Sequence, residues 1–335
     1  MSTLESLHIN RPTLGLTARV RRRLGAAVTD GFFLGAAKGA GWLPVASPRL
    51  HKVAVEKNIA YRHTGRDAHR LDVYRPTNAQ GPLPIVLYVH GGGFRFMSKD
   101  THWVFGLIYA RRGYLVVNVN YHLAPAHPFP GAVEDISAAW QWLVANAERL
   151  GGDLSRVVVA GESAGANLAA SLTLMTHQRR DEPYARDAYA TGVTPKAVVA
   201  ACGLYEVSNP ERFSQHATFF RDRIEEVTDA YLHGVRLRDR RTLELADPVV
   251  ALEGLTSVDR PLPPFFLPCG TWDLLMGDTQ RMVKALHRLG SRNSEAREYP
   301  RGPHAFHAFV VTPQALRCWK DTFAFLDATL VSGAK

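Results

Sequence analysis

The stretch Gly161–Gly165, which reads G-E-S-A-G, constrains this chain more than any other feature. An apolar run, Val157–Ala160, precedes it, and a segment of helical character, Ala166–Thr176, follows it. A strand, a sharp turn with a serine at its apex and a helix form the context that a nucleophile elbow requires. The two glycines are expected because side chains there would collide with the neighbouring strand and helix. The motif alone is weak, because a G-x-S-x-G arises by chance about one time in ten in a chain of this length.

Length and composition favour a large globular protein and no nucleic-acid partner. The chain has 335 residues, of which 46% are hydrophobic and 21% charged, as expected for a protein with a sizeable core. The three cysteines, at 202, 269 and 318, show no paired spacing, which favours reduced thiols and a cytoplasmic location. The net charge of +9 is dispersed over clusters without interleaved aromatic residues, at 19–23, 111–112, 179–180 and 236–241, and we interpret it as solvated surface.

Residues 1–50 predict one or two helices, rich in Ala, Gly and Arg, that cover a main domain. The best candidate for a membrane span is 24–45, but Asp30 and Lys38 interrupt it, and a span needs about 20 apolar residues. The basic cluster 19–23 begins too late for a typical signal peptide. We therefore expect no stable membrane insertion, and at most a weak association of this helix with a membrane surface.

Strand-like and helical segments alternate through most of the remaining chain. The alternation indicates an α/β fold with a mainly parallel sheet and helices on both faces. The interval 204–260 breaks the alternation and predicts a helical insertion that forms a second piece of a cap. We therefore divide the chain into N-terminal cap helices (1–50), a first core part (51–203), the cap insertion (204–260) and a second core part (261–335). The expected strands include 83–90, 114–119, 157–160, 197–201 and 265–268, and the expected helices are 102–112, 132–149, 164–178 and 278–289.

The run His90–Phe94, which reads H-G-G-G-F, follows directly on a buried strand. Three glycines leave backbone N–H groups bare, and a tetrahedral intermediate needs such donors at its oxyanion. The N–H of Ala164, the residue after the serine, supplies a further donor. A phosphate loop is disfavoured because no Lys-Ser/Thr pair follows the glycines.

A serine nucleophile also needs a base, and in α/β-hydrolases the order along the chain is serine, acid, histidine. His304 lies in a loop that follows the strand-like segment 296–299. His307 competes with it, but we favour His304 because it directly follows a Gly-Pro pair, whereas His307 resembles the start of the next helix.

The acid is expected on the loop after the strand-like segment 265–270. Asp273 is the candidate, with the role of accepting the imidazole N–H and stabilising the imidazolium. Asp278 competes, but it more plausibly caps the helix that starts there.

These stretches together resemble the hormone-sensitive lipase-like esterases (bacterial family IV), which are α/β-hydrolases with a helical cap. Residues 121–135 resemble the family's Y-R-L-A-P-E-x-P-F-P-A-A-x-x-D stretch, and the H-G-G-G-F, G-E-S-A-G, W-D-L-L and H-A-F segments match in order and roughly in spacing. The resemblance covers about residues 60–330. It implies carboxylic ester hydrolysis without cofactor or metal, by a triad of Ser163, Asp273 and His304. It also implies oxyanion donors from Gly92, Gly93 and Ala164, with Gly91 as an uncertain third glycine.

The chain departs from the family pattern at several positions. His122 and Ala126 replace an Arg and a Glu that we expect to form a structural pair, and losing both is less harmful than losing one. Glu162 stands where Asp is common, and both occur. The segments 273–275 and 304–306 read D-L-L and H-A-F where the family has D-P-L and H-G-F. None of these changes removes a reacting group.

The expected reaction is a two-step acyl transfer through an acyl-enzyme. A capped site favours a small-molecule ester with a short to medium acyl chain. Three alternatives stay open: an amidase or peptidase with the same triad, a non-catalytic ligand-binding member of the fold, and a membrane-surface lipase that uses residues 19–45 as an interfacial helix. A homodimer also stays open. An acyl pocket could include Phe94, Phe96, Met97, Phe213, Phe219 and Phe220, although apolar residues in a cap more often serve packing.

Overall fold

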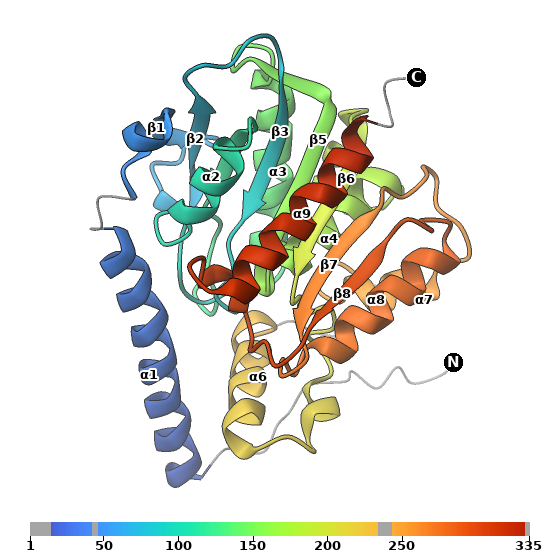
Figure 1. Ribbon diagram of the computed structural model, residues 1–335. Coiled ribbons are helices and arrows are strands. Elements are labelled where there is room, and N and C mark those ends of the chain that lie inside the picture. The colour runs from blue at the N-terminus through green and yellow to red at the C-terminus, as the bar shows by residue number, and fades with distance from the viewer. Residues whose placement is uncertain (1–14, 42–45, 234–242, 332–335) are drawn as a thin grey trace.

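The computed structural model describes residues 15–41, 46–233 and 243–331. Its centre is one sheet of eight strands in the order β1-β2-β4-β3-β5-β6-β7-β8 (Figure 1). Strand β2 pairs antiparallel with β1 and β4, and every pair from β4 to β8 is parallel. The strands are β1 Val53–Ala60, β2 Arg70–Pro76, β3 Leu83–Val89, β4 Leu115–Val119, β5 Gly152–Glu162, β6 Ala197–Ala201, β7 Phe265–Gly270 and β8 Glu295–Tyr299.

Helices cover both faces of this sheet. Side chains alternate along a strand, so Ile85 and Leu87 of β3 pack on one face with Trp140 of α3, while Val86 and Tyr88 pack on the other. Helices α2 and α9 lie on that second face, toward the viewer in Figure 1. The predicted mainly parallel sheet with helices on both faces is therefore confirmed. The helices are α1 Leu16–Gly41, α2 Trp103–Ala110, α3 Gly131–Asn146, α4 Ala164–His177, α5 Pro183–Ala190, α6 Thr218–Tyr231, α7 Pro248–Gly254, α8 Met276–Arg288 and α9 Pro313–Val331, with short 3-10 turns η2 Pro48–His51, η3 Asp67–His69, η4 Pro210–Phe213 and η6 Phe306–Ala308.

Helix α1 stands to one side of the sheet, beside α6 (Figure 1). Their contact is ionic: Arg22 is 8% exposed and reaches Asp222 at 3.5 Å, Asp229 at 3.1 Å and also Glu225. Arg21 adds a 2.6 Å pair with Asp222. The structure thus brings a helix of the predicted segment 1–50 against a helix of the predicted insertion 204–260. Parts of both segments, and the basic cluster 236–241, lie outside the described residues.

Helix α6 also lies against the glycine-rich loop after β3. Glu226 pairs with Arg95 at 2.7 Å, and Val227 lies so close to Gly93 that a Cβ on that glycine would come within 2.8 Å of it. Within the part of the chain that the structure describes, no helix is both long and apolar enough to cross a bilayer.

The ionic contact of α1 makes a prediction. Arg22→Ala removes the cation that Asp222, Glu225 and Asp229 share, although Arg21 still pairs with Asp222. We expect α1 to detach, so that limited proteolysis cleaves near it much faster, while the melting temperature of the core changes little. Arg23→Ala, the exposed neighbour, is the control. Equal cleavage of both variants would contradict this account.

Candidate active site

The turn between β5 and α4 holds Ser163 in a strained backbone conformation, with φ 52° and ψ −117°. Its N–H donates to the carbonyl of Ala201 on β6 at 2.9 Å. Gly165 allows the close approach behind the turn, because a Cβ there would lie 2.1 Å from the carbonyl oxygen of Val89. This conformation matches the predicted nucleophile elbow and places the serine at the carboxyl end of the parallel strands.

Three residues far apart in the sequence meet at this turn. Nε2 of His304 lies 3.0 Å from Oγ of Ser163, and Nδ1 of His304 lies 2.8 Å from Oδ2 of Asp273. Asp273 follows β7 and its side chain is fully buried, whereas His304 follows β8 and keeps a third of its side chain exposed. The structure thus joins the three predicted residues in one hydrogen-bonded chain, the geometry that a serine nucleophile, a base and an orienting acid require.

The surroundings of His304 favour its protonated form. Burial by itself lowers the pKa of the imidazole, but the Asp273 carboxylate, helped by the thiol of Cys202, outweighs burial and raises the pKa well above its usual range. The neighbouring carboxylate therefore stabilises an imidazolium, the form that the base adopts after it takes a proton.

The two competitors occupy other positions. His307 lies in the 3-10 helix η6, the first helical element after the loop of His304, and α9 begins later, at Pro313. Its ring contacts Glu162 at 3.1 Å. Asp278 lies in the first turn of α8 and does not cap it, which corrects the second interpretation. Its carboxylate accepts the N–H of Tyr205 at 2.9 Å and pairs with Arg212 at 2.7 Å, so it anchors the segment after β6.

The loop after β3 carries the predicted oxyanion donors. Gly92 and Gly93 have φ values of 104° and 57°, and among the described residues neither N–H donates a hydrogen bond. Ala164 is the first residue of α4, and its N–H therefore has no partner within the helix. The N–H of Gly91 instead lies 3.4 Å from Nε2 of His102. Gly92, Gly93 and Ala164 thus keep free donors near Ser163, whereas Gly91 already has a neighbour.

The predicted pocket residues fall into three groups. Phe94 is fully buried and stacks on Tyr231 at 3.7 Å between ring centroids, and Phe213 is 4% exposed. Both are core side chains. Their burial therefore favours a packing role, the alternative given above, over contact with a substrate. Phe219 and Phe220 on α6 are each 48% exposed. Phe96 and Met97 are half-buried next to Gly92, close to the donor loop.

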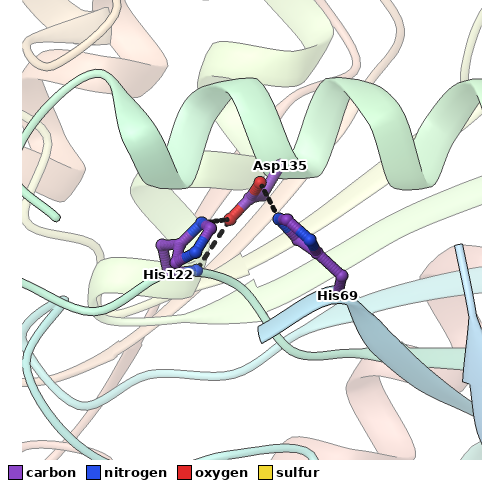
Figure 2. Close-up of side chains that lie close together, drawn as sticks. All are labelled: His69, His122 and Asp135. Carbon is purple, nitrogen blue, oxygen red and sulfur yellow. Dashed lines mark hydrogen bonds and ion pairs between the residues drawn. The ribbon is translucent and has the colours of Figure 1, made fainter. Parts of the chain in front are cut away.

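A histidine–aspartate cluster with metal-type ligands lies in the loop network beside α3 (Figure 2). Asp135 lies between His69, at 3.0 Å, and His122, at 2.7 Å, and Arg62 adds a 3.2 Å contact to the same carboxylate. Hydrogen bonds satisfy the carboxylate without an ion, and the guanidinium opposes a cation, so we interpret the cluster as structural. His122 thus holds Asp135, the last residue of the family-like stretch 121–135.

Sequence reasoning missed a buried network directly behind Ser163. The carboxylate of Glu162 lies between His102, at 2.8 Å, and His307, at 3.1 Å. Glu162 was visible as part of the G-E-S-A-G motif, but neither histidine belongs to a pattern that would have pointed to it.

Comparisons with known proteins identify the family of this chain. Residues 86–308 match the model of a family described as having the alpha/beta hydrolase fold. The carboxylesterase NlhH of Mycobacterium tuberculosis is 31% identical over 263 residues, 77% of each chain. The chain belongs to this family. It is a carboxylic ester hydrolase that resembles the hormone-sensitive lipase-like esterases, as the motifs indicated.

Two further comparisons bear on activity and fold. An ethyl acetate hydrolase of Pseudomonas putida is 41% identical over 123 residues, 35% of this chain and 39% of its own. The esterase LipW of Mycobacterium marinum superposes with a TM-score of 0.71 over 97% of this chain and 98% of its own, at 24% identity. The structural match shows the fold alone.

The raised pKa of His304 predicts the pH dependence of the enzyme. The base must be neutral to accept the serine proton, so kcat/KM should rise with pH and reach half its maximum above the ordinary imidazole value of about 6.5. Asp273→Asn should move this midpoint to lower pH and reduce kcat on the order of 10⁴-fold. The control is Asp278→Asn, which should leave the midpoint in place. A midpoint that Asp273→Asn does not move would contradict the assignment of the acid.

Proposed function

We propose that this enzyme hydrolyses small carboxylic esters through a serine acyl-enzyme, with Ser163 as nucleophile, His304 as base and Asp273 as orienting acid. The observation that carries the proposal is the chain of contacts at 3.0 Å and 2.8 Å on a strained strand–turn–helix.

The proposed reaction has two steps. His304 Nε2 takes the proton of Ser163 Oγ as that oxygen attacks the ester carbonyl carbon, and then gives the proton to the leaving alcohol as the C–O bond breaks. Water then attacks the acyl-enzyme, His304 takes its proton, and the acid leaves as Ser163 regains a proton. Asp273 holds the imidazole with its Nδ1–H toward the carboxylate throughout. No step requires a metal or a cofactor.

The oxyanion of each tetrahedral intermediate is assigned to the N–H groups of Gly92, Gly93 and Ala164. Their free donors and the positive φ values of the two glycines support this assignment. Donors already fixed where charge develops lower the barrier because they need no reorganisation. Each such donor contributes about 3–4 kcal/mol in enzymes where one was removed.

A helical cap is proposed to select the substrate. Helix α6 packs on the donor loop through Val227 at Gly93, and α1 packs on the outer side of α6. The cap would consist of residues 1–50 and 204–260, and the remaining chain would form the core. A site closed in this way favours short to medium acyl chains, in line with the relative that is named an ethyl acetate hydrolase.

Alternatives to ester hydrolysis differ from it in what the enzyme would cleave or bind. An amidase or peptidase with the same triad would cleave matched anilides as fast as esters. A non-catalytic binding role is disfavoured by the intact hydrogen-bonded chain at Ser163. The three cysteines are unpaired and buried, which supports a reducing compartment such as the cytoplasm. A weak membrane association of α1 and a homodimer stay predictions.

Replacing the nucleophile is the direct test. Ser163→Ala should lower kcat for p-nitrophenyl butyrate on the order of 10⁶-fold, with the melting temperature retained, because Ser163 carries the one hydroxyl that contacts His304 among the described residues. A fluorophosphonate should label wild type at Ser163 only. The control is Ser171→Ala on the same helix, whose hydroxyl bonds backbone carbonyls and should not matter for turnover. Substantial turnover by Ser163→Ala would defeat the proposal.

The cap generates a prediction about acyl length. Across p-nitrophenyl esters from acetate to palmitate, kcat/KM should peak at short or medium chains. Val227→Ala shortens the side chain that lies against Gly93. The larger space should shift the maximum of kcat/KM to esters with longer acyl chains. Val250→Ala on α7 serves as the control and should leave the profile unchanged. A wild-type peak at palmitate would show that the cap does not limit the acyl chain.

A further inference from the structure

Glu162, the residue before the proposed nucleophile, is buried and lies between two histidines from other parts of the chain. It ends β5, and its side chain is 7% exposed. Burial alone raises the pKa of this carboxyl, but its contacts with His102 and His307 outweigh burial and lower the pKa well below its usual range. The group is therefore a buried carboxylate with one hydrogen-bonded ring, His102, and a second ring, His307, in polar contact.

The first ring connects Glu162 to the proposed oxyanion loop. Nε2 of His102 lies 2.8 Å from Oε1 of Glu162 and donates its proton to that carboxylate oxygen. Because this nitrogen then carries the proton, the nitrogen of Gly91, 3.4 Å away, is in contact with it but not hydrogen-bonded. The Glu162 side chain also fills the space beside Gly91, where an added Cβ would lie 3.0 Å from Oε1. Gly91, the first glycine of the H-G-G-G run, therefore packs against the side chain of Glu162 and against the ring of His102.

The second ring connects Glu162 to the loop of the proposed base. Nε2 of His307 lies 3.1 Å from Oε2 of Glu162, three residues after His304. Nδ1 of His307 and Oε2 of Glu162 are both buried without a hydrogen-bond partner, so the 3.1 Å approach of Nε2 to Oε2 is a polar contact without hydrogen-bond geometry. Trp319 of α9 holds the same loop by donating to the carbonyl of His307 at 3.0 Å. The position of the base loop thus depends on a contact with the residue next to Ser163.

We propose that Glu162 is a positioning residue for ester hydrolysis, because its carboxylate joins the oxyanion loop, the nucleophile turn and the base loop through His102 and His307. The proposal rests on the proposed function of Ser163 and His304. It assigns a role to the second residue of the G-E-S-A-G motif that the reaction steps do not use. Glu162 itself does not touch the reacting atoms.

The chemical consequence follows from distance. The contacts of His304 with Ser163 and of the donors with an oxyanion are productive only over a few tenths of an ångström, and a misplacement of about 1 Å can lower the rate roughly 100-fold. Glutamine has the shape of glutamate, but its amide can accept from only one of the two rings and turns a donor toward the other. Glu162→Gln should therefore loosen one loop without opening a cavity.

The test compares two buried carboxylates that each lie between two histidines. Glu162→Gln should lower kcat for p-nitrophenyl butyrate roughly 10- to 100-fold and change KM less than about 3-fold, because alignment is lost and substrate contacts are kept. Rates are normalised to sites titrated with a fluorophosphonate. The matched control is Asp135→Asn, which also removes a buried carboxylate between two histidines (Figure 2). The partners of Asp135 among the described residues are His69, His122 and Arg62, and none of them belongs to the proposed triad. Its normalised kcat should stay within about 3-fold of wild type, even if its melting temperature falls.

A double-mutant cycle tests whether Glu162 influences kcat through its contact with His307. If Glu162 acts through His307, then Glu162→Gln and His307→Phe should each lower kcat, and the double variant should lose far less than the product of the two losses. Glu162→Asp keeps the charge with a shorter reach and should lie between wild type and Glu162→Gln. It also serves in place of Glu162→Gln if that variant does not fold.

Two outcomes would overturn the proposal. One is a wild-type kcat in Glu162→Gln, and the other is an equal loss of normalised kcat in Asp135→Asn, which would make the effect one of general stability. Failure of the proposed function would look different, because wild type would then show no labelling at Ser163. In Glu162→Gln the remaining turnover should still be abolished by the fluorophosphonate.

Discussion

The conformation of Ser163 depends on a close packing contact between the nucleophile turn and strand β3. A residue other than glycine with φ 52° costs about 1–3 kcal/mol, and it persists only where the surrounding structure fixes it. Here Gly165 lies against the carbonyl of Val89, the Ser163 N–H is bound by Ala201, and α4 is buried along its whole length. The strain is thus offset by the burial of a helix, and the serine hydroxyl is held above the sheet as a result.

The parallel topology explains why residues 141 positions apart can form one site. Strands β5, β7 and β8 run in the same direction, so the loops at their carboxyl ends meet at one edge of the sheet. Asp273 and His304 lie on the loops after β7 and β8, and the glycine-rich loop follows β3 at the same edge. Each loop can vary in sequence, but the sheet fixes where it begins. The network at Glu162 adds a direct connection among three of these loops.

Sequence predicted the sheet, its helices and the residues that meet at Ser163, because those features have local patterns: apolar runs, glycines and a fixed order of motifs. It failed where the outcome depends on tertiary contacts. The sequence around His102 does not indicate that its ring will contact Glu162, 60 residues later in the chain. The sequence around Phe94 likewise does not indicate that its ring will stack on Tyr231. Aspartate is a residue type that often caps helices, but the carboxylate of Asp278 instead accepts hydrogen bonds from backbone N–H groups of the segment after β6. The local preference of a residue type does not predict which of several possible hydrogen-bond partners it will bind in the folded protein.

The departures from the family-like stretch follow the same logic. Exchanging its Arg for His122 and its Glu for Ala126 removes a charge pair, but the buried Asp135 still needs donors. They come from His69, the last residue of η3, and from Arg62, in the loop after β1. His69 reaches the carboxylate from the opposite side to His122 (Figure 2). In this chain the cation beside Asp135 therefore comes from Arg62. Any N–H donor can satisfy a buried carboxylate, whereas loss of the carboxylate leaves several donors without an acceptor. The same reasoning applies to Glu162, where two histidines depend on one carboxylate beside the reacting serine.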